Sequence, residues 1–178
     1  MIYSDDYQFV FYPMPKTATC SLWEVLSLQY GAKEYPQCAM RGRHVMRLPK
    51  DQNFDDYLFF TVVRHPFTRA RSLWNHCQRL ENITVDFEDF VWHYLVPRTT
   101  WLCQTQSEWL RGLRVDCVLK MERINEDFSA LPFVCDCDVP VVNQGKVSKD
   151  FTERTYAGIQ KWAEEDLEKF HYHLVKVL

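Results

Sequence analysis

The stretch that decides the fold is residues 8–31, QFVFYPMPKTATCSLWEVLSLQYG. Its aromatic and β-branched start, Gln8–Tyr12, is typical of a strand, and two prolines end that run. Cys20–Gln29 then repeats apolar side chains at helical spacing, and Gly31 is the kind of residue that ends a helix. A strand, a tight loop and a helix in this order indicate the opening of an α/β unit.

A second strand and helix follow a long polar segment. Tyr57–Val63 (YLFFTVV) is continuously apolar, as a parallel strand buried on both faces is, and Pro66 suits the first turn of a helix through Leu80. The sequence therefore predicts an α/β protein with a central, mostly parallel sheet. The further elements expected are a helix over Phe87–Tyr94 capped by Asp86, strands over Val115–Met121 and Val139–Val142, a short helix over Glu126–Leu131 and closing helices across Phe151–Val177.

Length and charge narrow the class of protein. The 178 residues correspond to a single domain spanning residues 1–178. A net charge of -3 with no dense basic block argues against a nucleic-acid partner. The acidic start resembles no signal peptide, and the longest apolar runs fall well short of the roughly 20 residues of a membrane span, so we expect no membrane partner. Oligomeric state cannot be read from the sequence.

The seven cysteines fit a reducing compartment, because their number is odd and the chain is too large to need a disulfide frame. We therefore expect a cytoplasmic location. Cys135 and Cys137 form a C-x-C pair with no second Cys or His pair at zinc-site spacing, so small buried hydrophobes are favoured over a metal site.

The loop between the first strand and helix, Pro15–Ser21 (PKTATCS), has the composition of an anion site. Amides at a helix N-terminus attract phosphate, and a lysine with several hydroxyls adds to that attraction. The Walker A glycines are missing, however. Taken alone, the loop fits equally well an ordinary helix start in which Thr19 or Ser21 caps the helix and Lys16 is solvated.

A second candidate anion site lies where the buried strand 57–63 ends. Arg64 stands at the carboxyl edge of the sheet, where open α/β sheets bind ligands, and Ser72 lies two helical turns further on. The alternative is that Arg64 pairs with a carboxylate and Ser72 is a small packing residue. Two anion sites at neighbouring strand ends favour one ligand with two separated phosphate groups.

PKTATCSL followed by VVRHPFTRARSLW resembles the two signature loops of sulfotransferases that use 3′-phosphoadenosine 5′-phosphosulfate (PAPS), in particular the carbohydrate (uronyl 2-O-like) branch. VDCVLKMERINEDFSAL and VVNQGKVSKDFTERTY are similar to later segments of that family, so the resemblance spans about Phe9 to Tyr172. It implies a three-layer, P-loop-like fold with helices flanking the sheet, PAPS as sulfuryl donor, no metal, and a small-molecule or glycan acceptor.

The resemblance also implies roles for single residues. Arg64 and Ser72 match positions that hold the 3′-phosphate. Thr19 and Cys20 depart from the usual Gly and Thr, and a Cβ at position 19 is expected to restrict the backbone there. The matching 5′-phosphosulfate loop consists of Lys16, Thr17, Ala18, Thr19, Cys20 and Ser21, with Lys16 also catalytic.

An acceptor site is expected in the long loop that contains Arg41, Arg43 and His44. A His-Val pair in this region supplies the catalytic base in the uronyl 2-O branch, and the arginines suit an anionic acceptor. The alternative is a surface loop with an incidental histidine. Arg98 stands where relatives have Gln in a substrate loop, so it either contacts the acceptor or is simply exposed; His65 and Glu122 are weaker candidates for the base.

The predicted function is thus PAPS-dependent sulfuryl transfer to a hydroxyl group, and the resemblance implies that this hydroxyl belongs to a carbohydrate. Two alternatives remain at this stage. A small P-loop kinase using ATP and magnesium needs a carboxylate at a strand end, where this chain has Arg64. A catalytically inactive nucleotide-binding module is the other.

Overall fold

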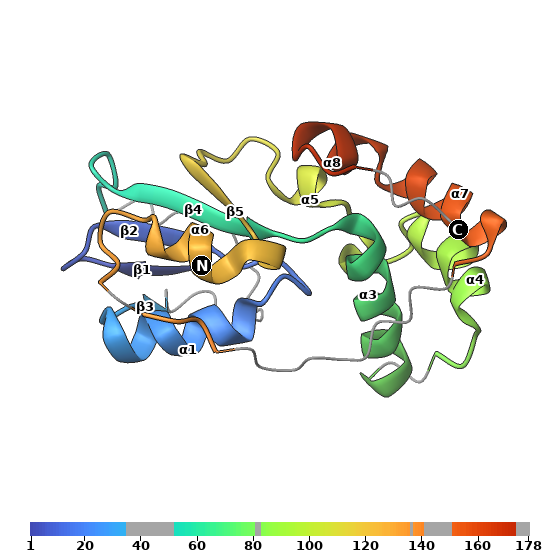
Figure 1. The fold of residues 1–178 in the computed structure, drawn as a ribbon, viewed down its shortest axis with the longest axis horizontal. Coiled ribbons are helices and arrows are strands. Elements are labelled where there is room, and N and C mark those ends of the chain that lie inside the picture. Colours follow the sequence, from blue (N-terminus) through green and yellow to red (C-terminus); the bar gives the residue numbers. More distant parts are fainter. Residues whose placement is uncertain (35–51, 81–82, 136, 141–150, 174–178) are drawn as a thin grey trace. The chain divides into compact units, whose positions relative to one another are not determined.

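The structure, a computed structural model, describes residues 1–34, 52–80, 83–135, 137–140 and 151–173. The chain forms two compact units (Figure 1). The first is built from Met1–Val63 and Gly112–Gln144, and the second from Arg64–Arg111 and Gly145–Leu178. That the two units form a single domain stays a prediction. Within the described ranges, no helix has both the length and the apolar character to cross a membrane.

The first unit contains a five-stranded sheet in the order β3-β1-β2-β4-β5. The strands β2, β4 and β5 are parallel, with Tyr12 opposite Thr61 and Thr61 opposite Val118. Strand β1 is antiparallel to both of its neighbours, β2 and β3. The bounds are β1 Ile2–Ser4, β2 Phe9–Tyr12, β3 Lys33–Glu34, β4 Leu58–Val63 and β5 Cys117–Lys120.

The three strands that lead to the candidate loops, β2, β4 and β5, are parallel, as predicted. The prediction of a mostly parallel sheet is wrong at the other edge, where the two short strands β1 and β3 pair antiparallel. The expected strand over Val139–Val142 is not formed at Val139 and Pro140, and its remainder lies outside the described residues. The α/β class with helices flanking a sheet is confirmed. The three-layer, P-loop-like arrangement stays a prediction.

Helices α1 (Thr19–Gln29) and α6 (Ile124–Ser129) cover one face of this sheet (Figure 1). The same face of β2 and β4 contributes alternate apolar side chains, because successive side chains of a strand point to opposite sides. Gly31, at φ +59°, follows α1 as the sequence predicts. The buried core comprises Phe9, Phe11, Leu22, Val25, Leu26, Phe60, Val62, Leu119 and Phe128, among others.

The second unit is helical. Helix α3 spans Pro66–Leu80, with the bounds that the sequence predicts, and α4 (Phe87–Phe90) begins at Asp86, whose carboxylate accepts from Asp89 N at 2.8 Å. The expected helix over Phe87–Tyr94 continues as a π-helical turn, η1. The remaining bounds are η1 Val91–Leu95, η2 Trp101–Cys103, α5 Gln106–Trp109, α7 Glu153–Trp162 and α8 Glu164–Lys169; in the first unit, η3 spans Met121–Arg123.

Helices α7 and η1 approach closely at Gly158, which supplies a test of this packing. A Cβ on Gly158 would lie 2.5 Å from Cγ1 of Val91 and 3.1 Å from Cε2 of Trp92. Alanine favours a helix over glycine by about 1 kcal/mol. The overlap of its Cβ with the buried, stiff side chain of Val91 costs more than this gain. We therefore expect Gly158→Ala to lower the free energy of unfolding by about 1–3 kcal/mol.

Chemical denaturation of Gly158→Ala checks this expectation. The exposed neighbour Ala157 provides the matched control, because Ala157→Gly changes helix propensity without changing the contact with η1. A Gly158→Ala variant at least as stable as the unchanged protein would contradict the close packing of α7 on η1.

Candidate functional site

The loop between β2 and α1 has two residues in the left-handed backbone region. Lys16 has φ 68° and Ala18 has φ 62°, and neither is a glycine. Non-glycine residues occupy this region at a cost of about 1–2 kcal/mol, and such positions concentrate at functional sites. Ala18 is the N-cap of α1, so the chain turns sharply and then enters the helix at Thr19.

Two buried threonine hydroxyls hold this loop together. Thr17 Oγ1 and Thr19 Oγ1 both donate to the carbonyl oxygen of Met14, at 3.1 and 2.6 Å. Thr19 therefore braces the preceding loop instead of capping α1. Each hydroxyl has a single proton, and in both threonines that proton is donated to the carbonyl oxygen of Met14. In this arrangement, Thr17 and Thr19 therefore present their backbone N–H groups to an anion.

The N-terminus of α1 has the features of an anion site. The side chain of its N-cap residue, Ala18, makes no capping hydrogen bond, and its first turn, Thr-Cys-Ser-Leu, contains no acidic residue. The first helical hydrogen bond runs from Leu22 N to Ala18 O at 3.1 Å, so the preceding amides have no partner within the helix. Half-buried Lys16 adds a positive charge to the partial positive charge of this helix end.

Thr19, which stands where the family usually has Gly, does not restrict the backbone, contrary to the expectation from the sequence. Thr19 is the first helical residue, and the left-handed conformations fall on Lys16 and Ala18 instead. A Cβ at position 19 therefore meets no conformational restriction. Cys20 has an exposed thiol, and Ser21 is buried in the first turn.

Arg64 follows β4 directly and belongs to the second unit. Its backbone N–H donates to Oε1 of Gln106 at 2.7 Å, and its carbonyl accepts from Nε2 of the same side chain at 2.9 Å. Its guanidinium Nε donates to Oγ1 of Thr68 at 3.0 Å. Both the backbone and the side chain of Arg64 are thus directed by partners in the same unit.

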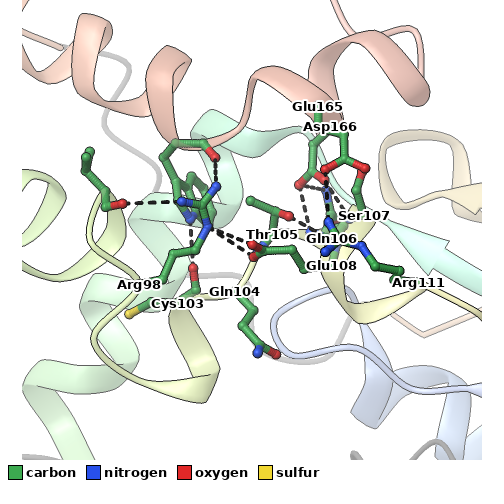
Figure 2. A network of polar contacts seen from close by, with 12 residues as sticks. Arg98, Cys103, Gln104, Thr105, Gln106, Ser107, Glu108, Arg111, Glu165 and Asp166 are labelled. Carbon is green, nitrogen blue, oxygen red and sulfur yellow. Dashed lines mark hydrogen bonds and ion pairs between the residues drawn. The ribbon is translucent and has the colours of Figure 1, made fainter.

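Gln106 and its neighbour Asp166 are residues that the sequence analysis missed. The fully buried carboxylate of Asp166 accepts from Gln106 N at 2.9 Å, Gln106 Nε2 at 3.2 Å and Ser107 N at 2.7 Å (Figure 2). The T-x-x-E pattern at Thr105 and Glu108 does predict the helix start at α5, and the capping box is formed. No sequence signal indicates that Gln106 contacts Arg64.

A buried cation on α3 contacts the chain just before α5. Arg69 is fully buried on α3, and its Nη1 donates to the carbonyl oxygen of Gln104 at 3.0 Å. Burial lowers the pKa of Arg69 to about 10, with the charge of Asp166 acting in the opposite direction. The side chain therefore remains cationic at neutral pH.

Two further predicted residues, His65 and Ser72, follow Arg64 in the chain. Ser72 is half-buried in the second turn of α3. His65 contacts the backbone on both sides of its ring, because Nδ1 lies 3.4 Å from Phe67 N and Nε2 lies 3.0 Å from the carbonyl oxygen of His173. An acceptor Nδ1 and a donor Nε2 satisfy both contacts, which is the arrangement of a residue that orients the turn.

Arg98, expected in the acceptor loop, is engaged within the second unit. Its Nε forms an ion pair with Oε1 of Glu108 at 3.0 Å (Figure 2). Its Nη2 donates to the carbonyl oxygen of Trp162 at 3.4 Å. These contacts give Arg98 a structural role. Its assignment to acceptor binding stays a prediction.

The other acceptor residues, Arg41, Arg43 and His44, lie outside the described residues. The weaker candidate Glu122 is exposed in η3, and nearby Asp127 accepts from Lys120 N at 2.7 Å, which ties α6 to the end of β5. In the part of the chain that the structure describes, no cluster of His, Cys, Asp and Glu side chains is suited to a metal ion. The expectation of no metal stays a prediction.

The structure thus brings residues 16–21 into one braced loop of the first unit and fixes Arg64 within the second. Comparison with known proteins adds the family. A model described as "Sulfotransferase family" matches residues 1–173, nearly the whole chain. No curated protein and no solved structure matches. Because the match covers well over half of the chain, this protein belongs to the sulfotransferase family, and its general chemistry is sulfuryl transfer.

Proposed function

We propose that this protein transfers the sulfuryl group of PAPS to a hydroxyl group, that of a carbohydrate in the first instance. The observation that carries the proposal is the loop at residues 16–21, in which a lysine shortly precedes the N-terminus of helix α1 with its backbone amides. This set of donors suits the 5′-phosphosulfate. Arg64 and Ser72 bind the 3′-phosphate in the same proposal.

The reaction is a single in-line displacement at sulfur. The acceptor oxygen forms a bond to sulfur while the bond from sulfur to the bridging 5′-phosphate oxygen breaks, and that oxygen keeps the electron pair. His44 takes the proton of the acceptor hydroxyl. Lys16 neutralises the charge that develops on the departing phosphate, an electrostatic role like that in phosphoryl transfer. The products are a sulfate ester and adenosine 3′,5′-bisphosphate.

Acceptor binding is assigned to Arg41, Arg43 and Arg98, whose positive charges suit a sugar carboxylate or sulfate. The uronyl 2-O-like branch remains part of the proposal, as does the cytoplasmic location. The kinase and inactive-module alternatives gain no support from the family match.

Ligand-dependent melting tests the nucleotide part of the proposal. Adenosine 3′,5′-bisphosphate at 100 times its Kd is expected to raise Tm by about 5–10 °C, because a ligand of the native state alone stabilises that state by mass action. AMP at the same concentration is expected to raise Tm much less. Arg64→Ala is expected to remove most of this difference, since a charge-assisted contact to phosphate is lost.

Arg79→Ala is the matched control, because Arg79 is an exposed arginine at the far end of the same helix, α3. It is expected to keep the preference for the bisphosphate. Equal shifts of Tm with AMP and the bisphosphate in the unchanged protein would rule out a 3′-phosphate site.

A further inference from the structure

The contact between Gln106 and Arg64 involves both backbone groups of a single residue. Arg64 lies between the end of β4 at Val63 and the start of α3 at Pro66. The side-chain amide of Gln106 accepts from the Arg64 N–H at 2.7 Å and donates to the Arg64 carbonyl oxygen at 2.9 Å. A planar amide that holds both groups fixes the position and direction of this residue.

Asp166 determines which way the Gln106 amide faces. All three groups that contact its carboxylate are N–H donors, so the carboxylate acts as acceptor in each contact. The amide nitrogen of Gln106 must therefore lie on the Asp166 side, and Oε1 is left to accept from Arg64 N. With the two groups exchanged, Oε1 would face a carboxylate oxygen and the amide nitrogen would face an N–H.

Because they are buried, the Gln106 amide and the Asp166 carboxylate depend on these hydrogen-bond partners. Asp166 and Gln106 are both fully buried, so water cannot replace a contact that is lost. Gln106 opens the short helix α5, and the two amides that Asp166 accepts from are those at the start of that helix. One buried carboxylate thus fixes the backbone of α5 and, through the Gln106 side chain, the backbone of Arg64.

We infer that Gln106 and Asp166 are positioning residues for Arg64, which set the direction of its guanidinium toward the 3′-phosphate of the nucleotide. This inference rests on the proposed function. The hydrogen bond from Arg64 Nε to Thr68 Oγ1 orients the side chain as well. Neither positioning residue needs to touch the nucleotide.

Titration calorimetry of the full chain with adenosine 3′,5′-bisphosphate and with AMP tests this inference. Gln106→Leu removes both hydrogen bonds to Arg64 and keeps a side chain of similar size. We expect the affinity for the bisphosphate to fall about tenfold or more while the affinity for AMP stays within about twofold. Gln104→Leu is the matched control, because Gln104 has an exposed side chain two residues earlier, and it should leave both affinities unchanged.

A double-mutant cycle separates positioning from general structural damage. If Gln106 acts through Arg64, Gln106→Leu should add little to the loss already caused by Arg64→Ala, because both variants remove the same phosphate contact. Asp166→Asn is the second variant. It is nearly isosteric with Asp166 but presents an amide nitrogen to N–H donors, so it should also lower the affinity for the bisphosphate selectively.

Four results would overturn the inference. Full preference for the bisphosphate in Gln106→Leu, or additive effects with Arg64→Ala, would reject the positioning role alone. Equal loss of AMP and bisphosphate binding in both Gln106→Leu and Asp166→Asn would make the two residues merely structural. Absence of any preference in the unchanged protein would reject the 3′-phosphate site itself, and the inference with it.

Discussion

His44→Ala is expected to lower kcat by roughly 10²–10⁴-fold, while the affinity for adenosine 3′,5′-bisphosphate stays nearly unchanged. The reason is that a general base acts on the acceptor proton and contributes little to holding the nucleotide. The measurement is steady-state transfer of labelled sulfate from PAPS to a panel of glycans, paired with calorimetric titration of the bisphosphate.

The pH profile gives an independent test of the same role. A base must be deprotonated to accept the hydroxyl proton, so kcat/KM of the unchanged protein should rise with pH through roughly pH 6–7, the ordinary range for histidine. His44→Ala should lose this acidic limb. His93→Ala is a suitable control, because His93 is an exposed histidine that pairs with Asp89 at the surface.

An unchanged rate and pH profile in His44→Ala would place the base elsewhere, with His65 and Glu122 as the next residues to replace. Loss of bisphosphate binding would mean instead that the loop around His44 serves the structure. His65 is the less suited of these residues to act as a base, since both of its ring nitrogens face backbone groups of the second unit.

The elements next to the candidate loops were predictable because their signals are local. A continuous apolar run followed by Arg-His-Pro sets the end of β4 and the start of α3, and the predicted bounds of α3 match the structure. Strand β1 was missed because it has only three residues and depends on pairing with β2 and β3. Pairing of this kind is a tertiary effect that short-range patterns do not encode.

The candidate site was predictable in its composition but not in its geometry. The lysine, the hydroxyls and Arg64 were evident from their places after strands, whereas the strained positions in the loop were not. Left-handed backbone is expected at Gly or Asn, and here it falls on Lys16 and Ala18. The contact between Gln106 and Asp166, which holds the side chain that binds Arg64, could not be predicted for a different reason. Asp166 lies sixty residues beyond Gln106, and only the fold brings them together.

Lys16→Ala is expected to lower kcat by roughly 10²–10³-fold, the usual effect of removing one donor that stabilises developing negative charge. Unlike the replacement of His44, it should also weaken the binding of PAPS and of the bisphosphate. The ammonium contacts phosphate in the ground state and gains more in the transition state, so both kcat and KM should change. The measurements are the kcat and KM for PAPS and the calorimetric Kd for the bisphosphate.

Alanine is the informative replacement because of the backbone at this position. Lys16 has φ 68°, so alanine keeps the Cβ and the backbone strain and removes only the charged part of the side chain. Lys16→Gly would change the charge and relieve the strain together, and the two effects could not be separated. Lys16→Arg keeps the charge and is expected to recover part of the binding. If Lys16→Ala bound the bisphosphate and turned over PAPS like the unchanged protein, the roles assigned to Lys16 in binding and in catalysis would both be wrong.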